Sequence, residues 1–168
     1  SLVYQADGID LLVRAKPQID GAGAVAARED EGVAITGLSL SDADAAGSEV
    51  LTLDLSVDAG TLALTDTAGS GVTIVTDNAG AVQLTGTLSQ INGFLGGANA
   101  VRFNPAADAS GAVTLTLAAT DGDGLQTSQT QTITVSPVDD GASATLAYLS
   151  FDGTDDYLDA GDADALDP

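Results

Sequence analysis

The stretch GAVTLTLAATDGDGLQTSQTQTITVSPVDD, residues 111–140, decides the fold class. Apolar and polar residues alternate in 112–120 and again in 130–136, and this period of two is typical of β-strands with one buried face. The residues expected to point inward are Val113, Leu115, Leu117, Ala119, Ile133 and Val135. Aspartates precede and follow the second run, and they repel one another unless water screens them or a cation binds them.

The same alternation extends over most of the chain. In residues 50–57 it places on one face Leu51, Leu53, Leu55 and Val57. Shorter runs occur at 33–36, 61–65, 72–76, 81–86 and 100–104, and they complete about seven or eight strands. Turn-forming residues separate several of them, at 58–60, 69–71 and 78–80. Short, evenly spaced strands with one polar face predict an all-β, antiparallel β-sandwich.

One segment departs from this pattern and predicts a short helix. Residues 87–95 carry apolar side chains at helical spacing, and Thr87 with Gln90 forms a possible capping box. Gly96 and Gly97 are suited to end the helix. We expect the helix to lie across one edge of the sandwich, with its apolar stripe in the core.

Two linker-like segments, 16–21 and 137–141, enclose a body of the size of one sandwich domain. Extra strand candidates lie outside it, at 9–13 and 145–151. The predicted organisation is therefore a terminal strand of a neighbouring or split domain in 1–19, the sandwich in 20–140, and a further domain start or capping strands in 141–168.

Composition excludes several classes of function. The 168 residues contain 25 acidic and 4 basic side chains, a formal net charge of −21. Such a charge excludes nucleic acid as a partner and argues against an anionic membrane surface. The alternative meaning of the acids is a solubilising, halophile-like surface. No run reaches the length of a membrane helix and the first residues do not resemble a signal peptide, so the chain reads as an internal fragment of a longer protein.

The chain contains neither Cys nor His, which removes disulfides, thiolate sites and the commonest catalytic base. It has no Trp and only three Tyr to stack a sugar, so a glycosidase cleft is not expected either. We therefore predict that the chain is not an enzyme.

Closely spaced carboxylates form four groups suited to calcium. This ion takes six to eight oxygen ligands, and alternate Asp side chains beside Gly converge readily on one ion. The candidate ligands are Glu29, Asp30, Glu31, Asp42, Asp44, Asp121, Asp123, Asp139 and Asp140. Each pair has an alternative meaning, because Asp before Gly commonly forms Asx turns. The acids crowded into 152–167 are a further possible calcium site or a solvated acidic tail.

The middle of the chain resembles the cadherin-like repeats of large bacterial surface adhesins of the repeats-in-toxin type. The resemblance covers about residues 20–140 and rests on ordered motifs: EDEGVAITGLSLSDADA (29–45), GTLALT (60–65), TGTLSQIN (85–92), VRFNPAADASGAVTLTLAATDGDG (101–124) and TITVSPVDD (132–140). It implies an Ig-like sandwich, tandem repeats, calcium at domain junctions and export to the cell surface.

The C-terminal residues 149–168, LSFDGTDDYLDAGDADALDP, resemble the start of a laminin-G or concanavalin-like lectin domain. GIDLLVRAKP, at 8–17, is similar to the last strand of the same fold. Because the first and last strands of that fold are neighbours, the resemblance implies that the two ends of this chain pair with each other or cap the sandwich.

The position of the acids follows from the expected sandwich. We expect Glu29–Glu31 near the upstream junction and Asp139–Asp140 near the downstream one. The pairs Asp42/Asp44 and Asp121/Asp123 are left without a pole, and we expect some of these four side chains to share one ion.

These observations favour a calcium-stabilised extender module of a bacterial cell-surface adhesin that supports cell adhesion or biofilm formation. The alternative is a carbohydrate- or protein-binding module formed with the lectin-like ends. The expected protein is extracellular and monomeric. Its expected partners are neighbouring domains of the same adhesin and, in the alternative, a glycan or surface protein.

Overall fold

The computed structural model describes residues 5–6, 9–10, 14–65, 69–78 and 80–138. The chain divides into two units, 1–138 and 139–168, and the second lies outside the described residues. Asp139, Asp140, the strand candidate at 145–151 and the lectin-like tail are therefore not described. Their pairing with the N-terminal strand, and the domain boundaries at 19/20 and 140/141, stay predictions.

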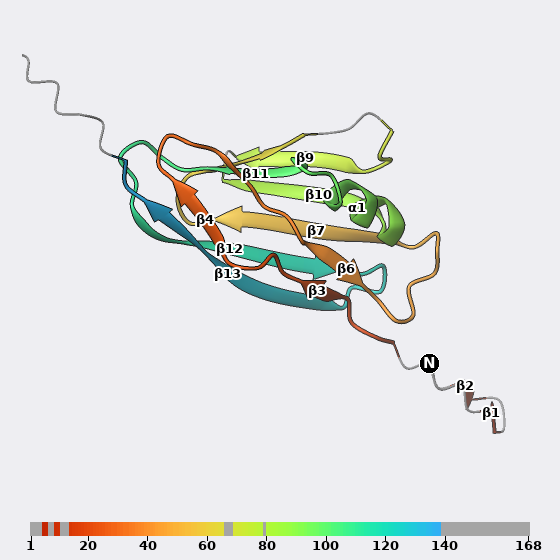
Figure 1. Ribbon diagram of the computed structural model, residues 1–168. Helices are drawn as coiled ribbons and strands as arrows, with labels where there is room; N and C mark the ends of the chain where they lie inside the picture. Colours follow the sequence, from red (N-terminus) through yellow and green to blue (C-terminus); the bar gives the residue numbers. More distant parts are fainter. Residues whose placement is uncertain (1–4, 7–8, 11–13, 66–68, 79, 139–168) are drawn as a thin grey trace, which may run out of the picture. The chain divides into compact units, whose positions relative to one another are not determined.

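Two layers of strands form the predicted β-sandwich (Figure 1). One layer is a six-stranded sheet in the order β4 (Val25–Arg28), β13 (Gln126–Ser136), β12 (Gly111–Thr120), β7 (Val50–Val57), β10 (Ala81–Thr87) and β9 (Thr73–Asn78). The other contains a three-stranded sheet, β5 (Val33–Ala34), β11 (Val101–Asn104) and β8 (Thr61–Leu64), and a two-stranded sheet, β3 (Gln18–Asp20) with β6 (Ser39–Ser41). The short strands β1 (Gln5–Ala6) and β2 (Ile9–Asp10) form a separate antiparallel pair. The all-β sandwich is thus confirmed.

The core is built by the alternation seen in the sequence. Leu51, Leu53 and Leu55 of β7 are at most 1% exposed, and the inward residues of β12 and β13 are buried as expected. Phe103 from β11 and Phe94 from the helix belong to the same hydrophobic cluster and are among its largest fully buried side chains. The two layers therefore bury one shared core, which is what makes the sandwich a single packed unit.

Four described strands were not predicted from the sequence pattern: β1, β3, β4 and β6. Strand β3 lies inside the segment 16–21 that we interpreted as a linker, and it pairs with β6. Strand β4 pairs with β13 in parallel, whereas the other described pairs are antiparallel. All four have two to four residues, which is too few to show the apolar alternation that marks β7 and β12.

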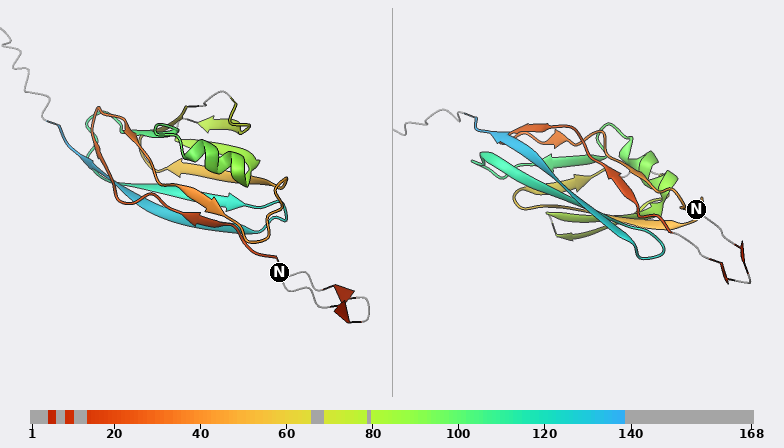
Figure 2. Two further views of the ribbon diagram at one scale, coloured as in Figure 1. Left: turned by 45° about the vertical axis from the view of Figure 1, so that its right-hand side comes forward. Right: turned by 90° about the horizontal axis from the view of Figure 1, so that it is seen from below.

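The predicted helix is present as α1 (Leu88–Leu95). Thr87 and Gln90 form the expected capping box: the Gln90 N–H donates to Thr87 Oγ1 at 3.3 Å, and the Thr87 N–H donates to Gln90 Oε1 at 2.8 Å. Ile91, Phe94 and Leu95 are buried, which confirms that the apolar stripe belongs to the core. Figure 2 shows α1 at the side of the sandwich, where it contacts β10 and β6. In the parts of the chain described here, no helix has the length and apolarity needed to cross a bilayer.

Candidate metal sites at the two poles

Strand β13 runs the length of the sandwich and defines its two poles. Its 11 residues span about 35 Å at the usual rise of a strand. We call the end that contains loop 121–125, loop 42–49 and the incoming segment 14–17 the upstream pole. The end that contains turn 29–32 and the outgoing residues 136–138 is the downstream pole. Figure 1 shows these ends of β13 at opposite sides of the sandwich.

The upstream loop is closed by Asp121, which follows β12 directly. Asp121 is 7% exposed, and its Oδ1 accepts hydrogen bonds from the N–H groups of Asp123 (2.9 Å) and Leu125 (2.8 Å). Gly124 has φ +83°, a conformation that glycine adopts without strain, and this lets the chain turn back into β13. The Asx-turn alternative is therefore present in the structure. Both bonds use Oδ1, which leaves Oδ2 of this buried carboxylate for another partner.

Asp42 and Asp44 lie beside this loop. The N–H of Asp44 donates to Asp42 Oδ1 at 3.3 Å, and the N–H of Ala15 donates to Asp44 Oδ2 at 2.9 Å. Burial raises the pKa of Asp42, and the neighbouring carboxyl groups of Asp44 and Asp121 raise it further. The hydrogen bond from Ala15 lowers the pKa of Asp44. The sequence did not indicate at which pole the pairs Asp42/Asp44 and Asp121/Asp123 lie. In the structure both pairs lie at the upstream pole.

Glu49 joins the two acidic loops, and sequence analysis did not single it out. Its Oε1 accepts a hydrogen bond from the Gly122 N–H at 2.9 Å, and its Oε2 accepts one from the Ala46 N–H at 3.2 Å. A Cβ atom at residue 122 would lie 3.0 Å from Glu49 Cγ, so glycine permits this close approach. The only sign of this role in the sequence is that Glu49 immediately precedes β7, and an acid at such a position is usually solvated. Glu49 therefore links the two loops that carry the ligand candidates of this pole.

A cation of the chain itself contacts the upstream pole. The guanidinium of Arg14 forms a salt bridge with Asp123 Oδ2. Arg14 is adjacent to Ala15, whose N–H binds Asp44, so the incoming segment contacts both acidic pairs. Pro17, three residues later, is fully buried and anchors the segment to the sandwich.

Glu29 lies at the downstream pole, and the expected position near the upstream junction was wrong. Its N–H donates to the Ser136 carbonyl at 3.0 Å, and its Oε1 accepts a hydrogen bond from the Val138 N–H. The reason is the parallel pairing of β4 with β13, which brings the ends of both strands, Arg28 and Ser136, side by side. At 4% exposure, Glu29 is a buried carboxylate beside the last described residue of the chain.

The rest of turn 29–32 is stabilised by its own backbone and by a residue of the three-stranded sheet. Asp30 is exposed and has φ +60°, while the Glu31 N–H donates to the Arg28 carbonyl at 3.2 Å and closes the turn. Arg102 of β11 donates from Nη2 to the Gly32 carbonyl at 2.7 Å. The turn therefore has a fixed backbone, with Glu29 directed into the protein and the exposed Asp30 and Glu31 near solvent.

The candidate carboxylates form one set at each pole, and the two sets differ in the number of acids. Within residues 14–65, 69–78 and 80–138, no three acidic side chains converge closely enough to form a complete metal-ligand group. The candidate ligand atoms at both poles are carboxylate oxygens, the type of ligand that calcium prefers. The upstream pole holds Asp42, Asp44, Asp121 and Asp123, and the downstream pole holds Glu29, Asp30 and Glu31.

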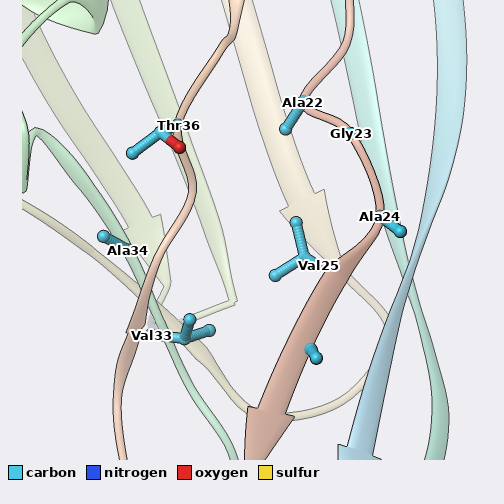
Figure 3. A pocket seen from close by; sticks show the side chains of 8 residues that line it. Ala22, Gly23, Ala24, Val25, Val33, Ala34 and Thr36 are labelled. Atoms are coloured by element: carbon cyan, nitrogen blue, oxygen red, sulfur yellow. The ribbon is translucent and has the colours of Figure 1, made fainter.

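A hollow between β4 and β5 is of a different chemical kind (Figure 3). It has a volume of about 290 Å³ and lies where the edge strands of the two layers face each other. Its lining carries one polar side chain, Thr36, among the residues Ala22, Gly23, Ala24, Val25, Ala26, Val33, Ala34 and Thr36. It offers neither the charges nor the convergent polar groups that the two poles contain.

Comparison with known proteins leaves the family open. The sequence matches no protein-family model and no curated protein. Among solved structures, the chain is similar to a cohesin module from a family 33 glycoside hydrolase of Clostridium perfringens, at 13% identity and a TM-score of 0.41. The match covers 76% of this chain and all of that module. A similarity of this size supports no statement about function.

Proposed function

We propose that the chain is a calcium-stabilised extender module of a bacterial cell-surface adhesin, which supports cell adhesion or biofilm formation. In this role the sandwich is one link in a row of domains, and calcium at its poles restricts bending between neighbours. The assignment to an adhesin rests on the resemblance of residues 20–140 to cadherin-like repeats.

The observation that carries the proposal is the position of two buried acids. Among the described residues, Glu29 and Asp121 are the charged side chains that are buried, and they lie at opposite poles. Burying a carboxylate is costly unless hydrogen bonds or a cation compensate it. Glu29 contacts the residues where the chain leaves the sandwich, and Asp121 lies in the loop next to the segment where it arrives. This is the arrangement that suits a domain linked end to end with others.

In this proposal each pole would contribute some of the oxygen ligands of a calcium ion. At the upstream pole Asp42, Asp44, Asp121 and Asp123 would hold the ion, and at the downstream pole Glu29 would do so with Asp30 or Glu31. Asp139 and Asp140 follow Val138 directly in the sequence and are the expected linker ligands. When bound, calcium neutralises carboxylates and crosslinks the loops that carry them. Since six to eight oxygens are needed, water or a neighbouring domain would complete each shell.

Isothermal calorimetry of the 168-residue chain tests the proposal directly. Titration with calcium is expected to show binding with a dissociation constant of about 10⁻⁴ to 10⁻³ M, the range of extracellular modules. Magnesium is expected to bind more weakly, because it gives up its water shell reluctantly. A chain that binds no calcium at several millimolar would rule out the proposed role.

Glu49→Ala is expected to weaken calcium binding at the upstream pole about tenfold, because residues that orient metal ligands commonly contribute that much to affinity. The variant removes the acceptor for the Gly122 and Ala46 N–H groups, so the two acidic loops lose their connection. Calorimetric titration measures the change, and Glu49→Gln, which keeps one acceptor oxygen, should lose less. Asp108→Asn is the matched charge control, since Asp108 is exposed and lies outside both upstream loops. Equal affinity of all the variants and the unaltered chain would contradict a positioning role.

The alternative ligand-binding role depends on residues 141–168, which lie beyond the described part of the chain. It stays a prediction, and a glycan array probed with the full chain would test it.

A further inference from the structure

Arg14 has a distinct position among the four basic residues of the chain. Arg102 donates to the Gly32 carbonyl and so belongs to the downstream turn, while Lys16 and Arg28 are exposed. The Arg14–Asp123 pair is the one salt bridge found in the described segments. The side chains of Arg14 and Asp123 are 46% and 31% exposed, so this contact lies at the surface, where a solute cation has access.

The contact places a positive charge where the proposed function requires calcium. Arg14 occupies an oxygen of Asp123, and the neighbouring Ala15 N–H occupies an oxygen of Asp44. A carboxylate oxygen bound to a guanidinium is not free to bind a metal, and the guanidinium also repels a divalent ion nearby. Arginine and calcium are therefore in competition for this pole.

We propose that Arg14 is a tethered counter-cation, which holds the incoming segment 14–17 against the upstream pole and is displaced when a divalent cation binds there. This inference rests on the proposed function. It adds that the pole has two states, one neutralised by Arg14 and one neutralised by metal, and that the position of the incoming segment differs between them.

The energetics favour such an exchange. Ion pairs at an exposed surface are weak, because both side chains are solvated and lose rotamer freedom. A divalent ion that binds several carboxylates at once gains more than one arginine does at a single carboxylate. Pro17 is fully buried, so we expect the displacement to be confined to residues 14–16 of the incoming segment.

Nuclear magnetic resonance of the chain labelled with ¹⁵N-arginine observes the exchange. The chain has three arginines, at 14, 28 and 102, and each gives one side-chain Nε–H signal. During titration with calcium chloride, the Arg14 signal is expected to shift toward that of a free arginine. The signals of Arg28 and Arg102 serve as internal references, because Arg28 is exposed and Arg102 is bound to a carbonyl rather than to an acid.

Calorimetry of three variants supplies the second readout. Arg14→Gln removes the competing charge and is expected to bind calcium about threefold to tenfold more tightly at the upstream pole. Arg14→Lys keeps the charge and is expected to resemble the unaltered chain. Arg28→Gln makes the same change in net charge at the downstream pole and should leave upstream binding unchanged.

The outcomes separate the inference from the proposed function. If the chain binds calcium but the Arg14 signal stays in place and Arg14→Gln has unaltered affinity, the tethered counter-cation is wrong and the extender role stands. An equal gain in Arg14→Gln and Arg28→Gln also overturns it, because the effect would then come from net charge alone. If neither the unaltered chain nor any variant binds calcium, both proposals fail.

Discussion

Calcium at several millimolar will raise the melting temperature of the chain by about 10 °C above its value in EDTA. Each site that binds only the folded state adds about 1–3 kcal/mol to the free energy of unfolding when calcium exceeds its dissociation constant. With one site at each pole the gain is a large share of the roughly 5–15 kcal/mol of a typical domain. Scanning calorimetry or circular dichroism measures the shift.

This prediction needs a control for net charge. A chain at −21 repels itself, and any salt relieves part of that repulsion. The calcium sample is therefore compared with samples at the same ionic strength in sodium chloride and in magnesium chloride. Specific coordination predicts a clearly larger shift with calcium. Equal melting temperatures in the three salts would contradict specific coordination and would mean that the acids only form a solvated surface.

Variants of the two buried carboxylates show how much of the calcium-dependent rise in melting temperature comes from each pole. Glu29→Gln keeps an acceptor oxygen for the Val138 N–H but removes the charge, and Asp121→Asn keeps an acceptor for the turn bonds of Asp123 and Leu125. Each variant is expected to lose about half of the calcium-dependent shift while it folds normally in EDTA. Loss of the whole shift in one of them would assign calcium to a single pole.

The sequence predicted strands and helix well where one local rule decides the structure. Strand β7 lies at 50–57 as expected, because its alternation of Leu with polar residues admits one register against a core. The helix begins after Thr87 because its capping box is a contact between residues three positions apart. In both cases the residues that interact are close in sequence.

The arrangement of the acids could not be predicted because it depends on long-range pairing. Glu29 belongs to the downstream pole only through the parallel contact of β4 with β13, more than 100 residues away in the sequence. The Ala and Gly residues around β4 give no local sign of that direction. Glu49 is similar: its partner Gly122 lies 73 positions further along the chain, and nothing near Glu49 indicates the contact.

Asn92→Ala will lower the free energy of unfolding by about 2–4 kcal/mol. The Asn92 side chain connects α1 to β6 through two hydrogen bonds: its Nδ2 donates to the Leu40 carbonyl, and its Oδ1 accepts from the Leu40 N–H, both at 2.8 Å. Leu40 is 4% exposed, so water does not readily replace the lost partners. Two backbone groups of a buried residue that are left without partners cost more than the two bonds themselves contribute. Urea unfolding followed by circular dichroism measures the loss.

Gly93→Ala is the matched control for this prediction, because residue 93 follows Asn92 on the same helix. Gly93 is exposed and a Cβ atom there would contact nothing within 4 Å. Its substitution should raise stability by about 0.5–1 kcal/mol through helix propensity alone. Asn92→Asp keeps the acceptor but places a negative oxygen against the Leu40 carbonyl, so it should be at least as destabilising as Asn92→Ala. A free energy of unfolding of Asn92→Ala within about 0.5 kcal/mol of that of the unaltered chain would be an ordinary surface effect. It would mean that the apolar face alone holds α1 in place and that the amide contact is dispensable.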